Sequence, residues 1–402
     1  MGKEGGFVME EQHNRAHTPD DRRMRAELRK KRQRKLLLRR TLIVSAAILI
    51  IAALVLLIVM IGQALMGQTP QRTVETEAAT PDDATPAYTA ALNFSTPQIA
   101  DDKKTEGAYS TLIDGVYLYN KRAFRTFDPD DGAADSYADA LSGLKRKAPE
   151  LTIYNMIVPT AIEFGVPDRL KESSVTTASQ SEFIRSVYSG YSADVVPVNC
   201  YNTLCDHLTE YTYFGTDSRW TALGAYYAYG AFMDALGERT LNLDICTEHT
   251  IDGFEGSLVY ADDGLWENLD TVHFWTFPFN TYAERTDNMG DEPYTTTVYY
   301  EGESGGAYAF GVFLWGDGAL VVEHNTDLQN GKKIAVVKDS FGNPFAPYLA
   351  ANYEEVHVID YNYYSGSIKS YCRNNDIDEV LILMSVSDAG DTDEIVRLQQ
   401  LF

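Results

Sequence analysis

Two segments of the chain carry side chains that could form a hydrolytic site. The segment VVKDSFGN, at residues 336–343, places Ser340 on a turn after a β-branched run. The segment FGTDSRWTALGAYYAYGAF, at residues 214–232, places Asp217 two residues before Arg219. Serine and aspartate are the nucleophile and the orienting group of a catalytic triad, whose third member is a base that accepts the serine proton.

The position of that base is occupied by arginine in this chain. Histidine is the usual base because neutral imidazole has a lone pair that accepts a proton near neutral pH. The Arg219 guanidinium stays protonated and has no such lone pair. Arg219 could instead pair with Asp217, offer its planar fork to a carboxylate or phosphate of a ligand, or form a solvated surface pair. We therefore predict impaired serine chemistry.

Another histidine could supply the missing base. The candidates in the predicted folded region are His207, His249, His273, His324 and His357. None stands in a recognisable catalytic constellation, and distance along the sequence does not measure reach in the fold. His207 is the first to consider, because it lies ten residues before Asp217.

The side chains around Ser340 indicate how such a site could be completed. Backbone N–H groups at the start of the following helix, together with the Asn343 amide, could form an oxyanion hole. In the alternative interpretation Ser340 is a helix N-cap and its segment is a packing motif. We assign Ser340, Asp217 and Arg219 to the candidate catalytic set, and Trp220, Asn343 and Asp339 to binding. We expect no metal site and no cofactor, because no Cys-x-x-Cys or paired-histidine spacing is present.

The elements that would position these residues follow from the hydrophobic pattern. Strands predicted at residues 333–337, 355–359 and 379–384 alternate with helices predicted at residues 344–352, 366–374 and 392–401. Such alternation predicts an α/β fold with a parallel sheet and helices on both faces. Ligands bind beyond the carboxyl ends of the strands in such sheets, and Ser340 lies at that end of its strand.

Earlier segments extend the pattern and then depart from it. Helices are predicted at residues 135–147, 179–188 and 220–236, and strands at residues 151–158 and 194–198. We expect Asp217 or Ser218 to cap the third of these helices and Gly237 to follow its end in a left-handed conformation. Residues 250–325 carry short alternating runs such as TVHFWTF, YTTTVYY and AYAFGVFLW, which favour hairpins and predict a β-rich insertion.

The N-terminal region differs from the rest in charge and composition. Residues 1–40 hold 13 Lys/Arg and 6 Asp/Glu, whereas the remaining residues hold 21 and 52. Residues 41–62 are uncharged and apolar over about the length of a single transmembrane helix, and a cleaved signal peptide would have a shorter apolar region. The positive-inside rule places the basic tail in the cytoplasm. Residues 63–105 predict a flexible extracellular stalk, and residues 106–402 the folded ectodomain.

The same charges predict partners. Anionic lipid at the inner leaflet suits the basic tail, since each Lys or Arg near that surface contributes about 1 kcal/mol. Nucleic acid is excluded as a ligand of the acidic body, because phosphate contacts need positive charge. Aromatic side chains such as Trp266, Trp275 and Trp315 could stack on sugars or fill the core. The four cysteines allow two disulfides in any of three pairings.

The two chemical segments also carry a family resemblance. Residues 214–229 resemble the signature of the DHHW proteins, which are membrane-anchored surface proteins of Gram-positive gut bacteria. Asp217-Ser218-Arg219-Trp220 stands where the signature has Asp-His-His-Trp, and the following GAYYAY run matches it. VVKDSFGN is similar to the second block of the family, and GFEGSLVY at residues 253–260 resembles its middle region. The resemblance covers about residues 106–402.

This resemblance implies a fold and a chemistry. DHHW proteins are similar to the SGNH-like, flavodoxin-like domains of the alginate O-acetylation proteins, which use an Asp-x-His pair and a later serine. By this resemblance Asp217 matches the aspartate, Arg219 the histidine and Ser340 the nucleophile. The implied function is a cell-surface protein that acts on envelope polysaccharide by ester hydrolysis or acetyl transfer, impaired by the missing histidine. The alternative is an inactive glycan-binding or scaffold protein of the envelope.

Overall fold

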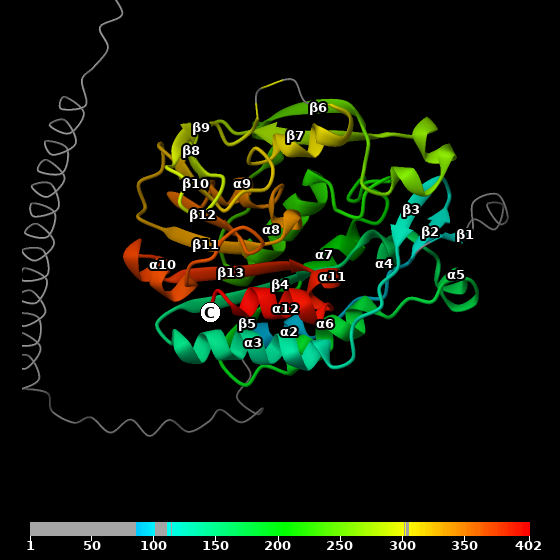
Figure 1. Ribbon diagram of the computed structural model, residues 1–402, viewed down its shortest axis with the longest axis horizontal. Helices are drawn as coiled ribbons and strands as arrows, with labels where there is room; N and C mark the ends of the chain where they lie inside the picture. Colours follow the sequence, from blue (N-terminus) through cyan, green and yellow to red (C-terminus); the bar gives the residue numbers. More distant parts are fainter. Residues whose placement is uncertain (1–85, 101–110, 114, 301, 303–304) are drawn as a thin grey trace, which may run out of the picture. The chain divides into compact units, whose positions relative to one another are not determined.

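The computed structural model describes residues 86–100, 111–113, 115–300, 302 and 305–402 (Figure 1). The predicted cytoplasmic tail at residues 1–40 and the predicted anchor at residues 41–62 lie outside these residues, as does much of the predicted stalk. Among the described helices, none is both long enough and apolar enough to cross a membrane.

Part of the predicted stalk is attached to the folded body. It forms α2 (Pro86–Ala91), which is followed by an extended segment. The side chain of Asn199, which caps α7 (Cys200–Asp206), donates a hydrogen bond to the Ala91 carbonyl at 3.0 Å. Residues 86–100 therefore belong to the folded body, because carbonyl groups of this polar segment find side-chain donors on it.

A mixed eight-stranded sheet forms the centre of the fold, in the order β5-β4-β13-β11-β12-β10-β8-β9. These strands are β5 (Val195–Pro197), β4 (Thr152–Val158), β13 (Glu379–Ser385), β11 (Lys333–Lys338), β12 (Glu355–Asp360), β10 (Leu320–Asn325), β8 (Thr281–Thr286) and β9 (Tyr294–Thr296). The first five pair in parallel, as the helix–strand alternation predicts. The last three join antiparallel, so the sheet is mixed.

Helices cover both faces of the sheet, as expected (Figure 1). Successive residues of β4 show this, because Asn155 donates to the Tyr137 hydroxyl of α3 (Ala133–Lys147), whereas the Tyr154 ring contacts Phe232 of α8 (Ala222–Leu236). The face of α3 also carries α6 (Gln180–Ser189), α11 (Val386–Ala389) and α12 (Thr392–Gln399). The face of α8 also carries α7 and α9 (Ala346–Leu349).

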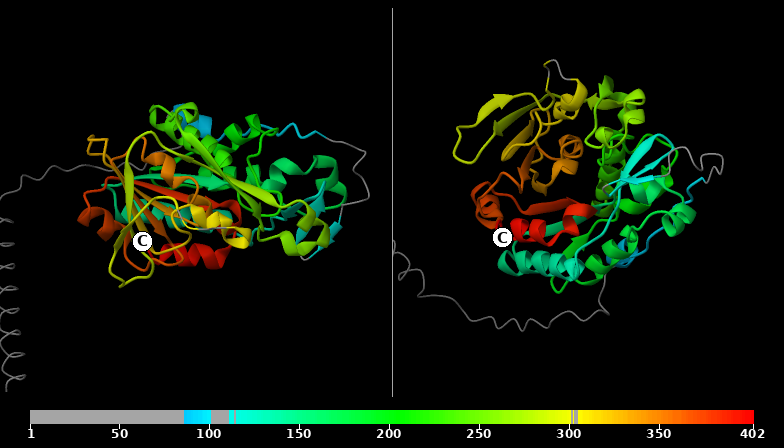
Figure 2. Two further views of the ribbon diagram at one scale, coloured as in Figure 1. Left: turned by 90° about the horizontal axis from the view of Figure 1, so that it is seen from above. Right: turned by 45° about the vertical axis from the view of Figure 1, so that its right-hand side comes forward.

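The predicted β-rich insertion is divided between two sheets. Its last three strands, β8 to β10, extend the central sheet at the end far from α3, where they are coloured yellow to orange in Figures 1 and 2. A separate hairpin contains β6 (Thr247–Phe254) and β7 (Asp270–Thr276). The AYAFGVFLW run is not a strand, because Gly306–Val312 form the 3-10 helix η6.

The other described elements lie around this frame. A small three-stranded sheet contains β1 (Thr111–Ile113), β2 (Val116–Tyr119) and β3 (Arg122–Arg125). The short helices are α4 (Ala161–Gly165), α5 (Asp168–Ser173), α10 (Ile368–Asn374), η3 (Leu243–Ile245), η4 (Val259–Ala261), η5 (Asp263–Glu267) and η7 (Ser340–Gly342). All four cysteines are free thiols, so none of the disulfides that the sequence allows is present.

The ends of α8 match the sequence only in part. Gly237 follows its last turn at φ 68°, the left-handed conformation that glycine adopts without strain, and this prediction is confirmed. The N-cap is Thr221, whose hydroxyl accepts a hydrogen bond from the Gly224 N–H. The prediction of Asp217 or Ser218 was wrong, because the Asp217 carboxylate is bound by other groups before the helix begins.

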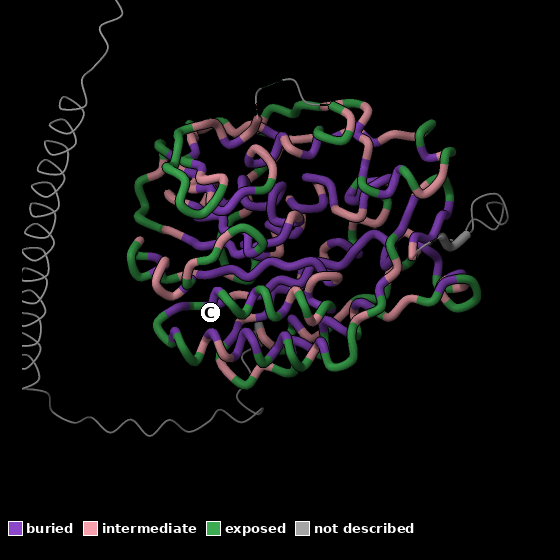
Figure 3. Tube along the Cα trace, in the orientation of Figure 1, coloured by how far each residue is buried: buried purple, intermediate pink, exposed green. Residues whose placement is uncertain are grey.

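The strands of the central sheet are largely buried (Figure 3), and among their buried residues is an acid, Glu323. Glu323 of β10 is fully buried, and neither carboxyl oxygen has a hydrogen-bond partner among the residues that the structure describes. Burial raises its pKa well above the ordinary value of 4.5. The folded protein therefore holds a proton that the unfolded chain releases as the pH rises above that value.

We expect this carboxyl to make stability fall as the pH rises, by up to about 1.4 kcal/mol per pH unit between its unfolded and folded pKa. Glu323→Leu should raise the free energy of unfolding at pH 8 by about 1–3 kcal/mol, since it removes an unpaired buried polar group. The increase in the free energy of unfolding should be smaller at pH 5. Urea unfolding at both pH values measures this. Glu323→Gln is the matched control, because it should remove the pH slope and keep the polar cost. A wild-type slope retained in both variants would contradict the assignment.

Candidate functional site

The structure brings the two chemical segments together through Trp220. This side chain is fully buried, and its indole N–H donates to the Phe341 carbonyl at 2.8 Å. Its ring contacts Phe341 and is stacked on Phe345 at a centroid distance of 6.4 Å. Trp220 directly follows Arg219, and Phe341 directly follows Ser340, so one buried contact fixes both segments at the carboxyl end of β11.

Asp217 and Arg219 form a two-pronged ion pair. The Arg219 Nε lies 2.7 Å from Asp217 Oδ1, and its terminal nitrogen lies 2.9 Å from Oδ2. Backbone N–H groups of Arg219 and Ser257 also donate to this carboxylate, at 2.9 and 2.8 Å. Burial alone would raise the pKa of Asp217, but the charge and hydrogen bonds of Arg219 outweigh it, and the net pKa lies below the ordinary value.

The guanidinium of Arg219 is also held on its flat face. It lies 3.6 Å from the ring centroid of Phe310 in η6, an arrangement that favours a cation. Its side chain is 20% exposed, whereas that of Asp217 is completely buried. Arg219 is therefore a fixed cation and not a proton acceptor, which agrees with the chemistry expected from its type.

The loop that carries Asp217 is anchored by a second carboxylate, Asp270 at the start of β7. Asp270 is buried and accepts four hydrogen bonds. The donors are the Tyr211 hydroxyl (2.6 Å), the Gly215 N–H (2.7 Å), the Thr216 N–H (2.7 Å) and the Thr216 hydroxyl (2.5 Å). Arg122 adds donors to the carbonyls of Tyr213 and Phe214. The hairpin thus determines where Asp217 lies.

Ser340 begins η7 and is half-buried, while Asp339 before it is fully enclosed. The cap of η7 is Asp339, which accepts from the Phe341 N–H at 2.9 Å, so Ser340 is not the N-cap. Asp339 also accepts from the Ser385 N–H at the end of β13, at 2.6 Å. Burial and then the negative charge of Asp388 raise the pKa of Asp339 well above its usual range. Asp339 therefore joins two strand ends.

Asn343 is buried beside this turn, and one of the two N–H donors of its side chain is engaged. It donates to Asp317 Oδ1 at 2.9 Å, while its own side-chain oxygen has no partner among the described residues. Lys338 lies behind the turn, buried in an ion pair with Asp360 at 2.6 Å. The Asp317 contact orients the Asn343 amide and leaves one N–H for an oxyanion.

The five candidate histidines lie in other contacts. His207 is stacked on Tyr227 and pairs with Glu210. His249 contacts Thr276, His273 contacts Glu248, and His357 lies between Tyr371 and Glu355. His324 is stacked on Tyr282. Within the described part of the chain, none of the five has a hydrogen bond to Asp217 or Ser340.

Sequence reasoning missed the residues that support the site from a distance. Asp270 and Ser257 come from the insertion, far from both segments in the sequence. A signal existed in GFEGSLVY, because a Cβ on Gly256 would lie 2.2 Å from the Thr216 carbonyl oxygen. Only glycine permits that approach, which lets the neighbouring Ser257 N–H reach Asp217.

Comparison with known proteins agrees with this architecture. The DHHW protein family matches residues 97–359. A DHHW family protein from Eubacterium siraeum has a similar crystal structure, with 25% identity and a TM-score of 0.64, covering 71% of this chain and 96% of that one. Bacillus cereus PatB1, solved with a sulfonyl adduct, shares the fold at 19% identity and a TM-score of 0.56, covering 68% and 97%.

A more distant similarity is to the O-acetyltransferase domain of Pseudomonas putida AlgJ, at 15% identity and a TM-score of 0.40, covering 71% of this chain and 98% of that one. No curated protein matches the chain. The family match extends over more than half of the sequence and includes both the Asp217 segment and the Ser340 segment. The chain therefore belongs to the DHHW family.

Proposed function

We propose that this protein binds envelope polysaccharide at the cell surface and lacks the serine–histidine chemistry that its fold could support. The observation that carries the proposal is the Asp217–Arg219 ion pair. Both carboxylate oxygens of Asp217 and two nitrogens of Arg219 are used within it. A triad aspartate must instead orient a neutral imidazole.

The surroundings of Ser340 support the same conclusion. The described histidines contact other partners, and the side-chain amide of Asn343 donates one of its two hydrogens to Asp317. Nucleophile activation and oxyanion stabilisation each contribute large factors to acyl transfer. With no described histidine placed to activate it, hydrolysis or acetyl transfer by Ser340 is expected to be slow, and we assign binding to the protein.

One observation favours a second candidate, an esterase or acetyltransferase in which Ser340 attacks and another group is the base. Ser340 is half-buried at the carboxyl end of β11. Its hydroxyl does not accept the N-cap hydrogen bond of its helix, which the alternative packing interpretation required. Asp217 would then orient the base through Arg219 or through a rearranged loop.

A fluorophosphonate probe distinguishes the two candidates. We expect wild type to react at the rate of Ser340→Ala, because no base is available, and Arg219→His to label Ser340 at least tenfold faster, since general-base assistance typically contributes 10²–10⁴-fold. Labelling of Arg219→His should rise with pH through about 6.5 as the imidazole loses its proton. Arg219→Gln is the matched control without a base. Rapid labelling of wild type would favour the enzyme, and an inert but folded Arg219→His would show that the triad analogy fails.

We also propose that residues 41–62 anchor the protein in the plasma membrane, with residues 1–40 on the cytoplasmic leaflet and the folded body outside a Gram-positive-type cell. The uncharged length of this segment and the basic residues before it support the proposal. A chain that starts at residue 63 behind a cleavable secretion signal should appear in the medium, whereas the full chain should sediment with membranes. Recovery of the full chain in the medium would contradict the anchor.

A further inference from the structure

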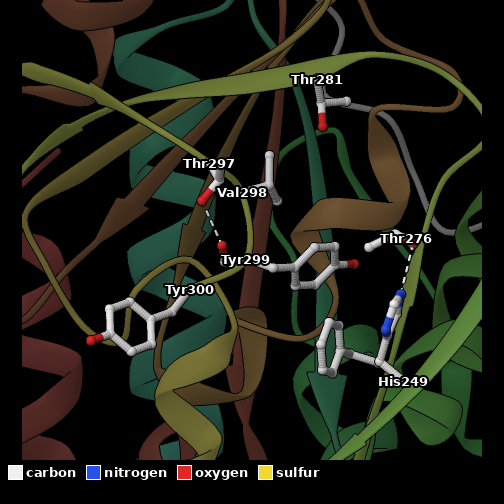
Figure 4. A pocket seen from close by; sticks show the side chains of 8 residues that line it. His249, Thr276, Thr281, Thr297, Val298, Tyr299 and Tyr300 are labelled. Atoms are coloured by element: carbon white, nitrogen blue, oxygen red, sulfur yellow. Dashed lines mark hydrogen bonds between the residues drawn. The ribbon is translucent and has the colours of Figure 1, made fainter. Parts of the chain in front are cut away.

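A pocket separate from Ser340 lies between the β6–β7 hairpin and the antiparallel end of the central sheet. Its volume is about 330 Å³, within the lower range of small-molecule sites. Figure 4 shows Thr281 on one side, Thr297 to Tyr299 on another, and His249 with Thr276 opposite. The remaining lining residues are Phe274 and Tyr300. From this lining we propose that the pocket binds one uncharged pyranose unit of a glycan, which rests on and extends the proposed polysaccharide binding.

The walls of the pocket combine aromatic rings with hydroxyl groups. His249 is stacked on Phe274 at a centroid distance of 5.0 Å, and Phe274 contacts Tyr299 at 5.1 Å. Pyranose rings present apolar C–H faces and hydroxyl edges, so a site for them needs both kinds of surface. Ligand pockets in general join apolar and aromatic walls with a few placed polar groups.

Two hydroxyls in the pocket are available to a ligand. Those of Thr276 and Thr297 already contact His249 and the Tyr299 carbonyl, at 2.9 and 2.6 Å. Thr281 and Tyr299 are half-buried, and their hydroxyls make no hydrogen bond to another described residue. In Figure 4 both point into the space that the labelled side chains surround. Unused donors in a partly enclosed space are what a sugar hydroxyl would satisfy.

The pocket is held in shape before any ligand arrives. The Trp315 indole N–H donates to the Thr297 carbonyl at 2.9 Å, and the Leu314 N–H donates to the Val298 carbonyl at 3.0 Å. The rings of Phe277 and Phe313 pack against the Tyr299 ring, with centroid distances of 6.1 and 6.3 Å. Little conformational freedom is therefore lost on binding. Trp315 supports the pocket from behind and is not itself the stacking surface.

The charge of the lining selects among glycans. Among the described residues, the lining contains no Lys, Arg, Asp or Glu, and His249 is the only titratable group there besides tyrosine. The chain after residue 40 carries 52 Asp/Glu against 21 Lys/Arg, so it repels anionic polymers. An uncharged sugar is thus the class that fits, and a uronic acid polymer is disfavoured.

Isothermal titration calorimetry of the full chain in detergent with three tetrasaccharides tests the proposal: cellotetraose, N-acetylated chitotetraose and tetragalacturonate. We expect at least one neutral probe to bind with a Kd of millimolar or lower, and tetragalacturonate to bind at least tenfold more weakly. Tyr299→Phe and Thr281→Val each remove one hydroxyl with little change in volume, and each should weaken neutral binding about tenfold. Tyr308→Ala, which truncates an exposed ring outside the pocket, should bind as wild type.

The outcomes separate this inference from the proposed function. Neutral binding that is unchanged in both Tyr299→Phe and Thr281→Val would place the glycan elsewhere on the protein and overturn the pocket. Preference for tetragalacturonate would overturn the ligand class, and binding of neither neutral probe would overturn the pocket as a pyranose site. Rapid fluorophosphonate labelling of wild type would contradict the proposed function and would leave the pocket proposal unaffected.

Discussion

Arg219→Ala is expected to lower the free energy of unfolding by about 3–5 kcal/mol at pH 7.5, because it leaves a buried carboxylate without its partner. Asp217 is completely buried, and Arg219 supplies two of its four hydrogen bonds through the side chain. The contact with Phe310 is lost as well. Urea unfolding monitored by tryptophan fluorescence measures the change, since Trp220 lies beside the pair.

The destabilisation caused by Arg219→Ala should depend on pH. In wild type the pKa of Asp217 is lowered, so the pair stabilises the protein above the unfolded-state value and the effect is lost as the pH falls through the folded-state value. In Arg219→Ala, burial should raise the pKa of Asp217, and the variant should be less destabilised at pH 5 than at pH 7.5. Arg239→Ala, which removes an exposed arginine, should have little effect at either pH.

A double-mutant cycle tests whether the two side chains act as a pair. Asp217→Asn combined with Arg219→Ala removes both charges, so it should be more stable at pH 7.5 than Arg219→Ala alone. Additive effects of the two changes would show that the ion pair does not contribute as a unit. The structural role of Arg219 would then lie in its contact with Phe310.

The sequence predicted the parallel half of the fold because each of its strands is a continuous apolar run between helices. β4, β11, β12 and β13 are buried on both faces, and runs of this kind are typical of parallel sheets. The insertion was harder to predict, since a hairpin pattern does not say which sheet its strands join. β8 to β10 extend the central sheet, whereas β6 and β7 form their own.

The candidate site could also be predicted only in part from the sequence. Local spacing suggested an Asp217–Arg219 ion pair as one of three interpretations of Arg219, because residues two apart on a turn can reach each other. The partners contributed by Ser257, Asp270 and Asp388 come from distant segments, and one sequence contains no measure of their proximity. Asp317 is a further example, because it uses the Asn343 amide that the sequence assigns to an oxyanion hole.

Asp270→Asn is expected to be as damaging as the loss of Arg219, although Asp270 touches neither Asp217 nor Ser340. Its carboxylate accepts four hydrogen bonds from Tyr211, Gly215 and Thr216, and an amide would turn an NH₂ group toward N–H or O–H donors. Hydrogen bonds to charged groups contribute roughly 1.5–3 kcal/mol each, so a loss of at least about 3 kcal/mol is expected.

Asp270→Asn should also disturb the Asp217–Arg219 pair, because Thr216 connects Asp270 to the chain around that pair. The Thr216 hydroxyl accepts from the Gly256 N–H, and the Thr216 carbonyl accepts from the Leu258 N–H at 2.8 Å. Through Thr216, Asp270 therefore holds both segments that flank Asp217. In an Arg219→His background, Asp270→Asn should therefore reduce fluorophosphonate labelling at temperatures where the protein is still folded. Asp263→Asn, an exposed aspartate of the same region, is the matched control. Labelling that is unchanged by Asp270→Asn, with stability reduced, would show that Asp270 supports the fold without positioning the site.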